Sequence, residues 1–303
     1  MLTSYQNTVA DKPSVRSLLT MGGIATAPIV SMLKSEGISN TLHSWYTDEY
    51  AKAKDNANPE VSGIAGLGTD TKKKLTNATQ ILKNEVSMSW RKRSIEQYTG
   101  DEWARQLENV GKEHMKDIEY ALLGLNHTTV FDDYVYAAND TDSSKMAGFF
   151  NFIPTANRNS AGGAFTLELL NATIEPVWAN SGVTDHKFKV FMSSALKRKV
   201  NDWVAANSAL RVAVTDRTLN LPIDRIMTDF GEVDIIIHPL FSDAKLKDKI
   251  LVGDFSDCAL RYLDDTQVKD FPTSKTADAK LYYTDCTLEV ADPFSLACAE
   301  KLQ

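Results

Sequence analysis

The chain has 303 residues, of which 43% are hydrophobic and 24% are charged, as in an ordinary globular protein with a real core. Its formal net charge is −7, which argues against a dedicated nucleic-acid-binding protein because such a protein needs a basic surface. No apolar run is long enough to cross a membrane, and residues 1–12 lack the pattern of a secretory signal.

The first part of the chain predicts two extended regions. Residues 1–39 form an N-terminal arm with a short helix, which Gly22-Gly23 and Pro28 interrupt. Residues 40–98 form an extended loop, because two strand-like runs flank a stretch that is rich in Gly, Ala, Asn and Lys and too poor in apolar residues to build a core. These runs are Asn40–Tyr50 and Thr79–Trp90.

The two runs predict a two-stranded arm that projects from a body. Val86-Ser87-Met88-Ser89-Trp90 alternates between apolar and polar side chains, as in a strand with one wet face. An isolated hairpin is at best marginally stable in water. We therefore expect the arm to lie on another surface, for which a neighbouring copy of the same chain is the obvious candidate.

A long amphipathic helix is predicted after the basic bend Arg91–Arg93, beginning near Gly100. Thr99 and Glu102 have the spacing of a capping box. Gly124 is the expected C-terminal cap, which gives about 24 residues and a rod of roughly 36 Å. Apolar side chains recur every three or four residues on one face, at Trp103, Leu107, Val110, His114, Ile118, Ala121 and Leu125. His114 is expected to be a satisfied core or interface histidine.

The second half predicts short helices and antiparallel strands, so the fold class is α+β. A loop-rich connection over 126–160 carries an apolar cluster at Phe149, Phe150 and Phe152. Pro176 is expected to end or kink the next helix, and Phe230-Gly231 is expected to form a hairpin turn. Helices are predicted at Phe165–Ala179 and from Ser193 or Ser194 to Asn207, and strands at Lys187–Met192, Ile223–Asp229, Glu232–His238, Ile250–Val252, Ala259–Leu263 and Lys280–Val290.

Catalytic and cofactor motifs are missing from the sequence. There is no phosphate-binding loop, no dinucleotide fingerprint and no His-Glu-x-x-His motif, and the five histidines are dispersed. Cys258, Cys286 and Cys298 lie far apart without a C-x-x-C pair, which predicts reduced, structural thiols. We therefore predict no enzyme activity, no catalytic residue, no cofactor and no metal.

Several segments, taken in order, resemble the major capsid proteins of tailed double-stranded DNA phages, whose shell fold is shared with encapsulins. One departure is the bend at Trp90 to Arg93, which is heavier and more charged than the small residues of the family. The similar segments are Thr26–Leu33, Asn40–Asp48, Asn77–Lys83, Lys116–Gly124, Lys145–Ile153 and Tyr282–Pro293.

The resemblance implies a division of the chain into named parts. Residues 1–39 correspond to an N-terminal arm and 40–98 to an extended β-hairpin loop. A peripheral domain, built on the long spine helix, takes 99–160 and 251–303. An axial domain takes 161–250.

A cluster of lysines at the expected arm tip is the one candidate interaction site. Lys72, Lys73 and Lys74 form a dense basic run, which Lys52 and Lys54 join. One interpretation is a solvated loop that keeps the chain soluble. The other is a cationic tip that binds an acidic patch of a neighbouring subunit.

The resemblance implies a structural protein that assembles with itself into hexamers and pentamers of an icosahedral phage head. Scaffold, portal and decoration proteins are expected partners, and the shell encloses double-stranded DNA without sequence-specific binding. The implied location is the virion, with assembly in the host cytoplasm. The alternatives are an encapsulin-type cellular compartment, which shares the fold, and a soluble enzyme of unknown type, which the missing motifs disfavour.

Overall fold

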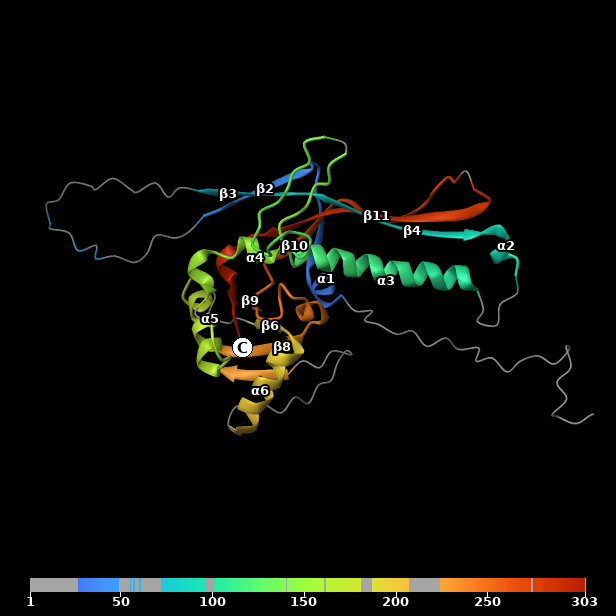
Figure 1. Cartoon of the computed structure of the whole chain (residues 1–303). Helices are drawn as coiled ribbons and strands as arrows, with labels where there is room; N and C mark the ends of the chain where they lie inside the picture. Colours follow the sequence, from blue (N-terminus) through green and yellow to red (C-terminus); the bar gives the residue numbers. More distant parts are fainter. Residues whose placement is uncertain are drawn as a thin grey trace, which may run out of the picture.

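The computed structural model describes residues 27–48, 72–95, 101–139, 141–160, 162–180, 187–206, 224–273 and 275–302, and also residues 55, 57 and 60. Helices and sheets are mixed, which confirms the α+β class. The described strands form a four-stranded sheet, a six-stranded sheet and a two-stranded hairpin. Figure 1 shows the hairpin at one side of the molecule and the four-stranded sheet, with its long helix, reaching to the other side.

The four-stranded sheet has the strand order β1-β10-β11-β4. These strands are Lys34–Gly37, Cys258–Asp270, Ala277–Val290 and Gln80–Ser89. β10 and β11 are the two inner strands. β11 is antiparallel to both β10 and β4, whereas the short β1 adds to the edge of β10 in parallel. β10 is much longer than the Ala259–Leu263 strand expected from the sequence, because its polar outer half pairs with β11 instead of forming a loop.

The long helix α3, Glu102–Leu122, packs along this sheet as Figure 1 shows. Val86 and Met88 of β4 contact Trp103 of α3 in a small apolar cluster. Further along, the hydroxyl of Tyr282 donates to the carbonyl of Leu107 at 2.9 Å. The predicted apolar stripe therefore faces the sheet.

The ends of α3 confirm one expected cap and correct the other. The N-cap is Asp101, whose carboxylate accepts from the backbone N–H groups of Trp103 and Ala104, so the Thr99 capping box is wrong. Glu102 binds Arg105 instead. At the other end Gly124 has φ +72°, and the bonds from Gly124 N to Ala121 O and from Leu125 N to Tyr120 O complete a Schellman motif.

The hairpin pairs different strands from those the sequence predicted. β2, Leu42–Thr47, pairs with β3, Lys73–Ala78, while the predicted partner run 79–90 forms β4 of the four-stranded sheet. β4 belongs to the four-stranded sheet, where its apolar face is buried against α3. The short helix α2, Trp90–Arg93, occupies the predicted basic bend.

The six-stranded sheet has the order β5-β12-β9-β6-β8-β7 and carries a second core. The helices α5, Leu167–Asn180, and α6, Ser194–Ala206, contribute apolar side chains to this core, and α5 continues through Pro176 rather than ending there. The hairpin turn at Phe230-Gly231 is confirmed, with φ +120° at Gly231. The strands are Arg158–Asn159, Leu296–Ala299, Ile250–Gly253, Phe188–Met192, Gly231–Ile237 and Asp224–Thr228.

This sheet crosses the expected boundary at residue 250. β9 begins at Ile250 and lies almost wholly in the segment 251–303, as does β12, which the sequence did not predict. β9 pairs with β12 on one side and, on the other, with β6 from the segment 161–250. The two parts of the chain are therefore joined by a continuous sheet.

The largest core lies where the end of α3 meets the turn α4, Phe149–Phe152. Phe149, Phe150 and Phe152 are buried there, as predicted, with Ile29 of the short helix α1, Pro28–Met32. Three short 3-10 helices are also present among the described residues, at Thr155–Asn157, Pro239–Ser242 and Pro293–Ser295. No helix in the part of the chain that the structure describes could span a bilayer.

Candidate interface at the root of the hairpin arm

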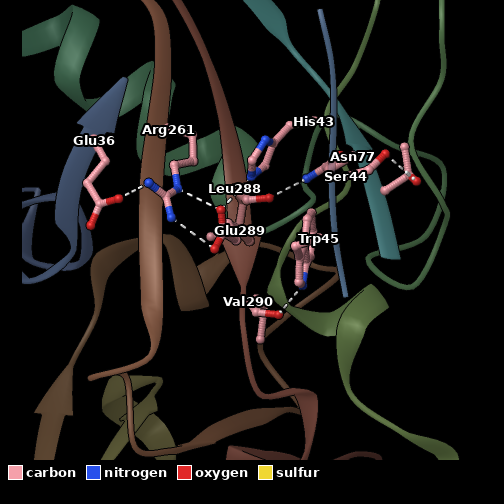
Figure 2. Close-up of polar contacts among 10 residues, drawn as sticks. Glu36, His43, Ser44, Trp45, Asn77, Arg261, Leu288, Glu289 and Val290 are labelled. Carbon is pink, nitrogen blue, oxygen red and sulfur yellow. Dashed lines mark hydrogen bonds and ion pairs between the residues drawn. The ribbon is translucent and has the colours of Figure 1, made fainter. Parts of the chain in front are cut away.

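The hairpin β2–β3 is attached to the body at its base, which we call the arm root. It consists of His43, Trp45, Asn77, Arg261 and Glu289 with the backbone groups that they bind. Figure 2 shows these side chains converging from β2, β3, β10 and β11. The sequence folds this way locally because His43, Trp45 and Asn77 share the face of the hairpin that is turned toward β11.

Asn77 fixes the position of β3. Its side chain is fully buried and its amide nitrogen donates to the carbonyls of Leu288 at 2.8 Å and Ala147 at 3.2 Å. Its amide oxygen accepts from the backbone N–H of Ala147 at 2.9 Å. One side chain therefore links the hairpin to both β11 and the segment before α4.

Trp45 fixes the position of β2. Its indole N–H donates to the carbonyl of Val290 at 2.8 Å, and its ring lies 5.5 Å from the ring of Phe152. The ring of His43 stacks on the indole with centroids 5.5 Å apart. The indole thereby satisfies a polar group at the edge of the largest core while burying its apolar surface.

A charged network joins the hairpin to the sheet. The guanidinium of Arg261 donates to both carboxylate oxygens of Glu289, at 2.6 and 3.0 Å, and also binds Glu36 of β1. His43 Nε2 contacts the same carboxylate of Glu289. Burial raises the pKa of Glu289, but the hydrogen bonds from Arg261 and His43 outweigh burial, so its pKa lies below the ordinary value.

An open groove of 440 Å³ lies beside the arm root. Its walls come from both strands of the hairpin, from the loop before α4, from α4 and the residues that follow it, and from the turn at Pro293. The lining residues combine apolar surface at Phe152, Pro154 and Phe294 with charge at Lys73, Lys74 and Asp133. Such a surface can accept an extended peptide segment.

The structure places only part of the predicted lysine cluster. Lys72, Lys73 and Lys74 are exposed, yet Lys73 and Lys74 belong to β3, opposite Thr47 and Tyr46, rather than to the tip of the arm. Lys73 reaches the ring of Phe294 at 5.7 Å. Lys52 and Lys54 lie outside the described residues.

The predicted core histidine is confirmed. His114 is fully buried, with Nδ1 at 2.6 Å from the amide oxygen of Asn84 and Nε2 at 2.7 Å from the hydroxyl of Thr284. Burial lowers the pKa of His114, so the neutral ring is favoured.

The cysteines behave as small hydrophobic groups. Cys258, Cys286 and Cys298 are buried and unpaired, and burial raises the pKa of each thiol. Within the described ranges, no group of three or more His, Cys, Asp or Glu side chains is arranged to hold a metal ion.

Sequence reasoning missed most of the arm root. Asn77 and His43 stood inside segments that carried the family resemblance, but no pattern singled out either side chain. The pairing of Arg261 with Glu289 depends on the register of β10 and β11, which places residues 28 positions apart on one face. A single sequence gives no signal for that register.

Comparison with protein families gives a match along nearly the whole chain. The model described as "SU10 major capsid protein" matches residues 2–303. A curated relative, the major capsid protein of Escherichia phage Phieco32, is 35% identical over 150 residues. That match covers 45% of this chain and 42% of the relative, so less than half of the relative's length is spanned.

Comparison with solved structures shows the same fold at low sequence identity. The capsid asymmetric unit of cyanophage A-1(L) has a TM-score of 0.64 at 13% identity, covering 99% of both chains. The capsid of the native GTA particle has a TM-score of 0.60 at 12% identity, covering 99% of this chain and 97% of the other. The SrpI encapsulin of Synechococcus elongatus PCC 7942 has a TM-score of 0.57 at 12% identity, covering 99% and 93%.

Proposed function

Because the chain belongs to the SU10 major capsid protein family, we propose that it is the shell subunit of a tailed double-stranded DNA phage. Copies assemble into hexamers and pentamers of an icosahedral head. The shell encloses the genome without sequence-specific binding, in keeping with the net charge of −7. Assembly takes place in the host cytoplasm, with scaffold, portal and decoration proteins as partners.

The anchored hairpin is the observation that best supports this proposal. Asn77, Trp45 and His43 fix the hairpin to the body, and its outer end at Thr47 and Lys73 lines the open groove. A firmly attached two-stranded hairpin is suited to contact a neighbouring copy. The role is structural, as the family implies.

Assembly tests the proposal directly. Purified full-length chain should form large closed particles, seen by light scattering and electron microscopy, under some condition of salt and pH between 5 and 8. A small monodisperse species under all these conditions would contradict a shell subunit.

An encapsulin-type compartment is the second candidate, favoured by the likeness to the SrpI encapsulin. The fold alone does not separate the two. Particles isolated from producing cells should contain long double-stranded DNA that resists added nuclease if the chain is a phage subunit. Particles that contain cargo protein and no DNA would favour the compartment.

The lysines of the arm are proposed contacts with the neighbouring subunit. We expect Lys52, Lys54, Lys72, Lys73 and Lys74 changed together to glutamate to abolish assembly or to make it strongly salt-dependent, because repulsion is repeated at every copy. Exposed ion pairs contribute only about 0.2–1 kcal/mol each, so the thermal melting of the isolated chain should stay close to wild type.

The matched control changes the same five lysines to arginine, which keeps the charge. This variant should assemble normally. Normal particles from the glutamate variant would show that the lysines are only a solvated surface. A strongly lowered melting temperature would show that they support the fold of the chain itself.

A further inference from the structure

We propose that the arm root is a pH-sensitive latch, in which protonation of His43 tightens the attachment of β2 to β11. His43 Nε2 contacts the carboxylate of Glu289, and the two side chains are 20% and 10% exposed. Figure 2 shows the imidazole directed at this carboxylate from the hairpin side, opposite Arg261. The contact joins β2 of the hairpin to β11, an inner strand of the four-stranded sheet.

The other two attachments do not change with pH near neutrality. Trp45 donates to the backbone carbonyl of Val290, and Asn77 donates to the backbone carbonyl of Leu288. Donors and acceptors in both bonds are uncharged groups that do not titrate in this range. These bonds hold the hairpin at every pH, and the histidine adds a contribution that can be switched.

The charged groups around His43 carry a net negative charge while its ring is neutral. Glu289 of β11 accepts from it, Arg261 of β10 lies behind Glu289, and Glu36 of β1 binds the far side of Arg261. The neighbouring strand β3 presents the neutral Asn77 in register with His43. One guanidinium therefore stands against two carboxylates, and a proton on His43 brings this network to neutrality.

The added proton has a defined place. Glu289 is ionised, since Arg261 holds its pKa below the ordinary value despite burial, so it accepts hydrogen bonds only. His43 Nε2 must carry the proton of that contact, and the second proton adds at Nδ1. The resulting cation lies 5.5 Å from the ring of Trp45, where it gains a cation–π attraction as well.

The consequence for the molecule is an arm that is held more firmly at mildly acidic pH than at mildly alkaline pH. An ordinary imidazole changes charge between pH 5 and 8. If the chain is a shell subunit, as proposed above, every arm in a particle responds together. The latch itself is a property of each chain and is measured separately from assembly.

Hydrogen–deuterium exchange on the full-length chain tests the latch. Exchange of the amides of β2, residues 42–47, is measured at pH 5.5 and pH 8.0 and compared with β6, residues 188–192, which corrects for the intrinsic pH dependence of exchange. We expect the corrected exchange of β2 in wild type to be about tenfold slower at pH 5.5, as a charged hydrogen bond requires.

Two variants at one position provide the controls. His43→Gln keeps an N–H donor toward Glu289 but has no titration, so its corrected exchange should be fast at both pH values. His43→Lys carries a permanent cation, so its corrected exchange should be slow at both. The latch is overturned if wild type shows no difference between the two pH values, or if His43→Gln retains the wild-type difference. Failure of the chain to form particles would leave this measurement unaffected.

Discussion

At the scale of single residues, a few polar side chains hold together elements that no apolar contact could place so specifically. Asn77 uses both ends of its amide to bind three backbone groups from two segments. Glu289 binds a cation from β10 and an imidazole from the hairpin. Each such side chain is buried, so losing it would leave its partners without hydrogen bonds.

Replacement of Asn77 by alanine should lower the free energy of unfolding by about 2–4 kcal/mol, because the N–H of Ala147 and two carbonyls lose their buried partner. Urea denaturation measures the change. Asn40→Ala is the matched control, since Asn40 is exposed and its change should cost less than about 0.5 kcal/mol. Equal effects of the two substitutions would mean that the buried amide contributes nothing beyond an exposed one.

Glu289 should make stability depend on acid. Its pKa is lowered in the folded chain, so its contribution is complete above the ordinary value of 4.5 and is lost as pH falls through the lowered value. Glu289→Gln should therefore unfold more easily than wild type at pH 7, by about 1–3 kcal/mol, and the difference should shrink as the pH is lowered from 5 through the lowered pKa. Melting curves across this range provide the measurement, and a constant difference would rule out the carboxylate as its source.

At the scale of elements, the sequence predicted those whose signal is local. The stripe of α3, its glycine cap, the alternation of β6 and the turn at Gly231 all lie within one segment, and all are confirmed. The predicted strand pairing was wrong, because the partner of a strand depends on residues far away in the sequence. Residues 79–90 alternate as a strand should, but their partner is β11, which lies about 200 residues further along the chain. Their apolar face is buried against α3 in that sheet.

The same reasoning explains why the arm root escaped prediction. His43, Asn77 and Glu289 meet because three strands come together in one register. Polar residues in strands are common, and nothing in a single sequence marks the few that are buried. The β12 strand was missed for a related reason, because a short apolar run such as Leu296–Ala299 is equally compatible with a helical segment.

Two glycines set how closely the end of α3 approaches α4. A Cβ atom on Gly148 would lie 2.4 Å from the backbone nitrogen of Gly124, which is far inside van der Waals contact. Gly148→Ala should therefore lower the free energy of unfolding by about 2–4 kcal/mol, since backbone must move at the largest core. Gly37→Ala serves as the control, with 3.9 Å of space to the nearest atom. If both variants melt like wild type, the two segments are not in tight contact.

At the scale of the whole molecule, two cores are joined by a sheet that uses strands from both halves of the chain. β9 lies between β12 and β6, so residues 250–253 and 296–299 belong to the same layer as 188–192. The resemblance implied a peripheral and an axial domain, and the continuous sheet predicts that both unfold together. The family and its fold could be inferred from local segments in their order along the chain. The six-stranded sheet that joins the two parts of the chain could not.

The three cysteines give a readout of that cooperativity, because they are spread over both sheets and are buried. Labelling with a thiol reagent should proceed at one common rate for Cys258, Cys286 and Cys298, since only global unfolding exposes them. Mass spectrometry after timed labelling in moderate urea follows each site. Faster labelling of Cys298 alone would show that the six-stranded sheet opens independently.

The place of β11 and β12 has a consequence for how the chain is made. Each is inserted between strands that precede it in the sequence: β11 between β10 and β4, and β12 between β5 and β9. As the polypeptide leaves the ribosome, β4 and β5 have no strand to pair with until residues 277–299, which contain β11 and β12, have been translated. A nascent chain in which the hairpin and α3 have already been synthesised therefore still lacks the strands to which they attach, so its folding cannot be completed until translation has passed this point.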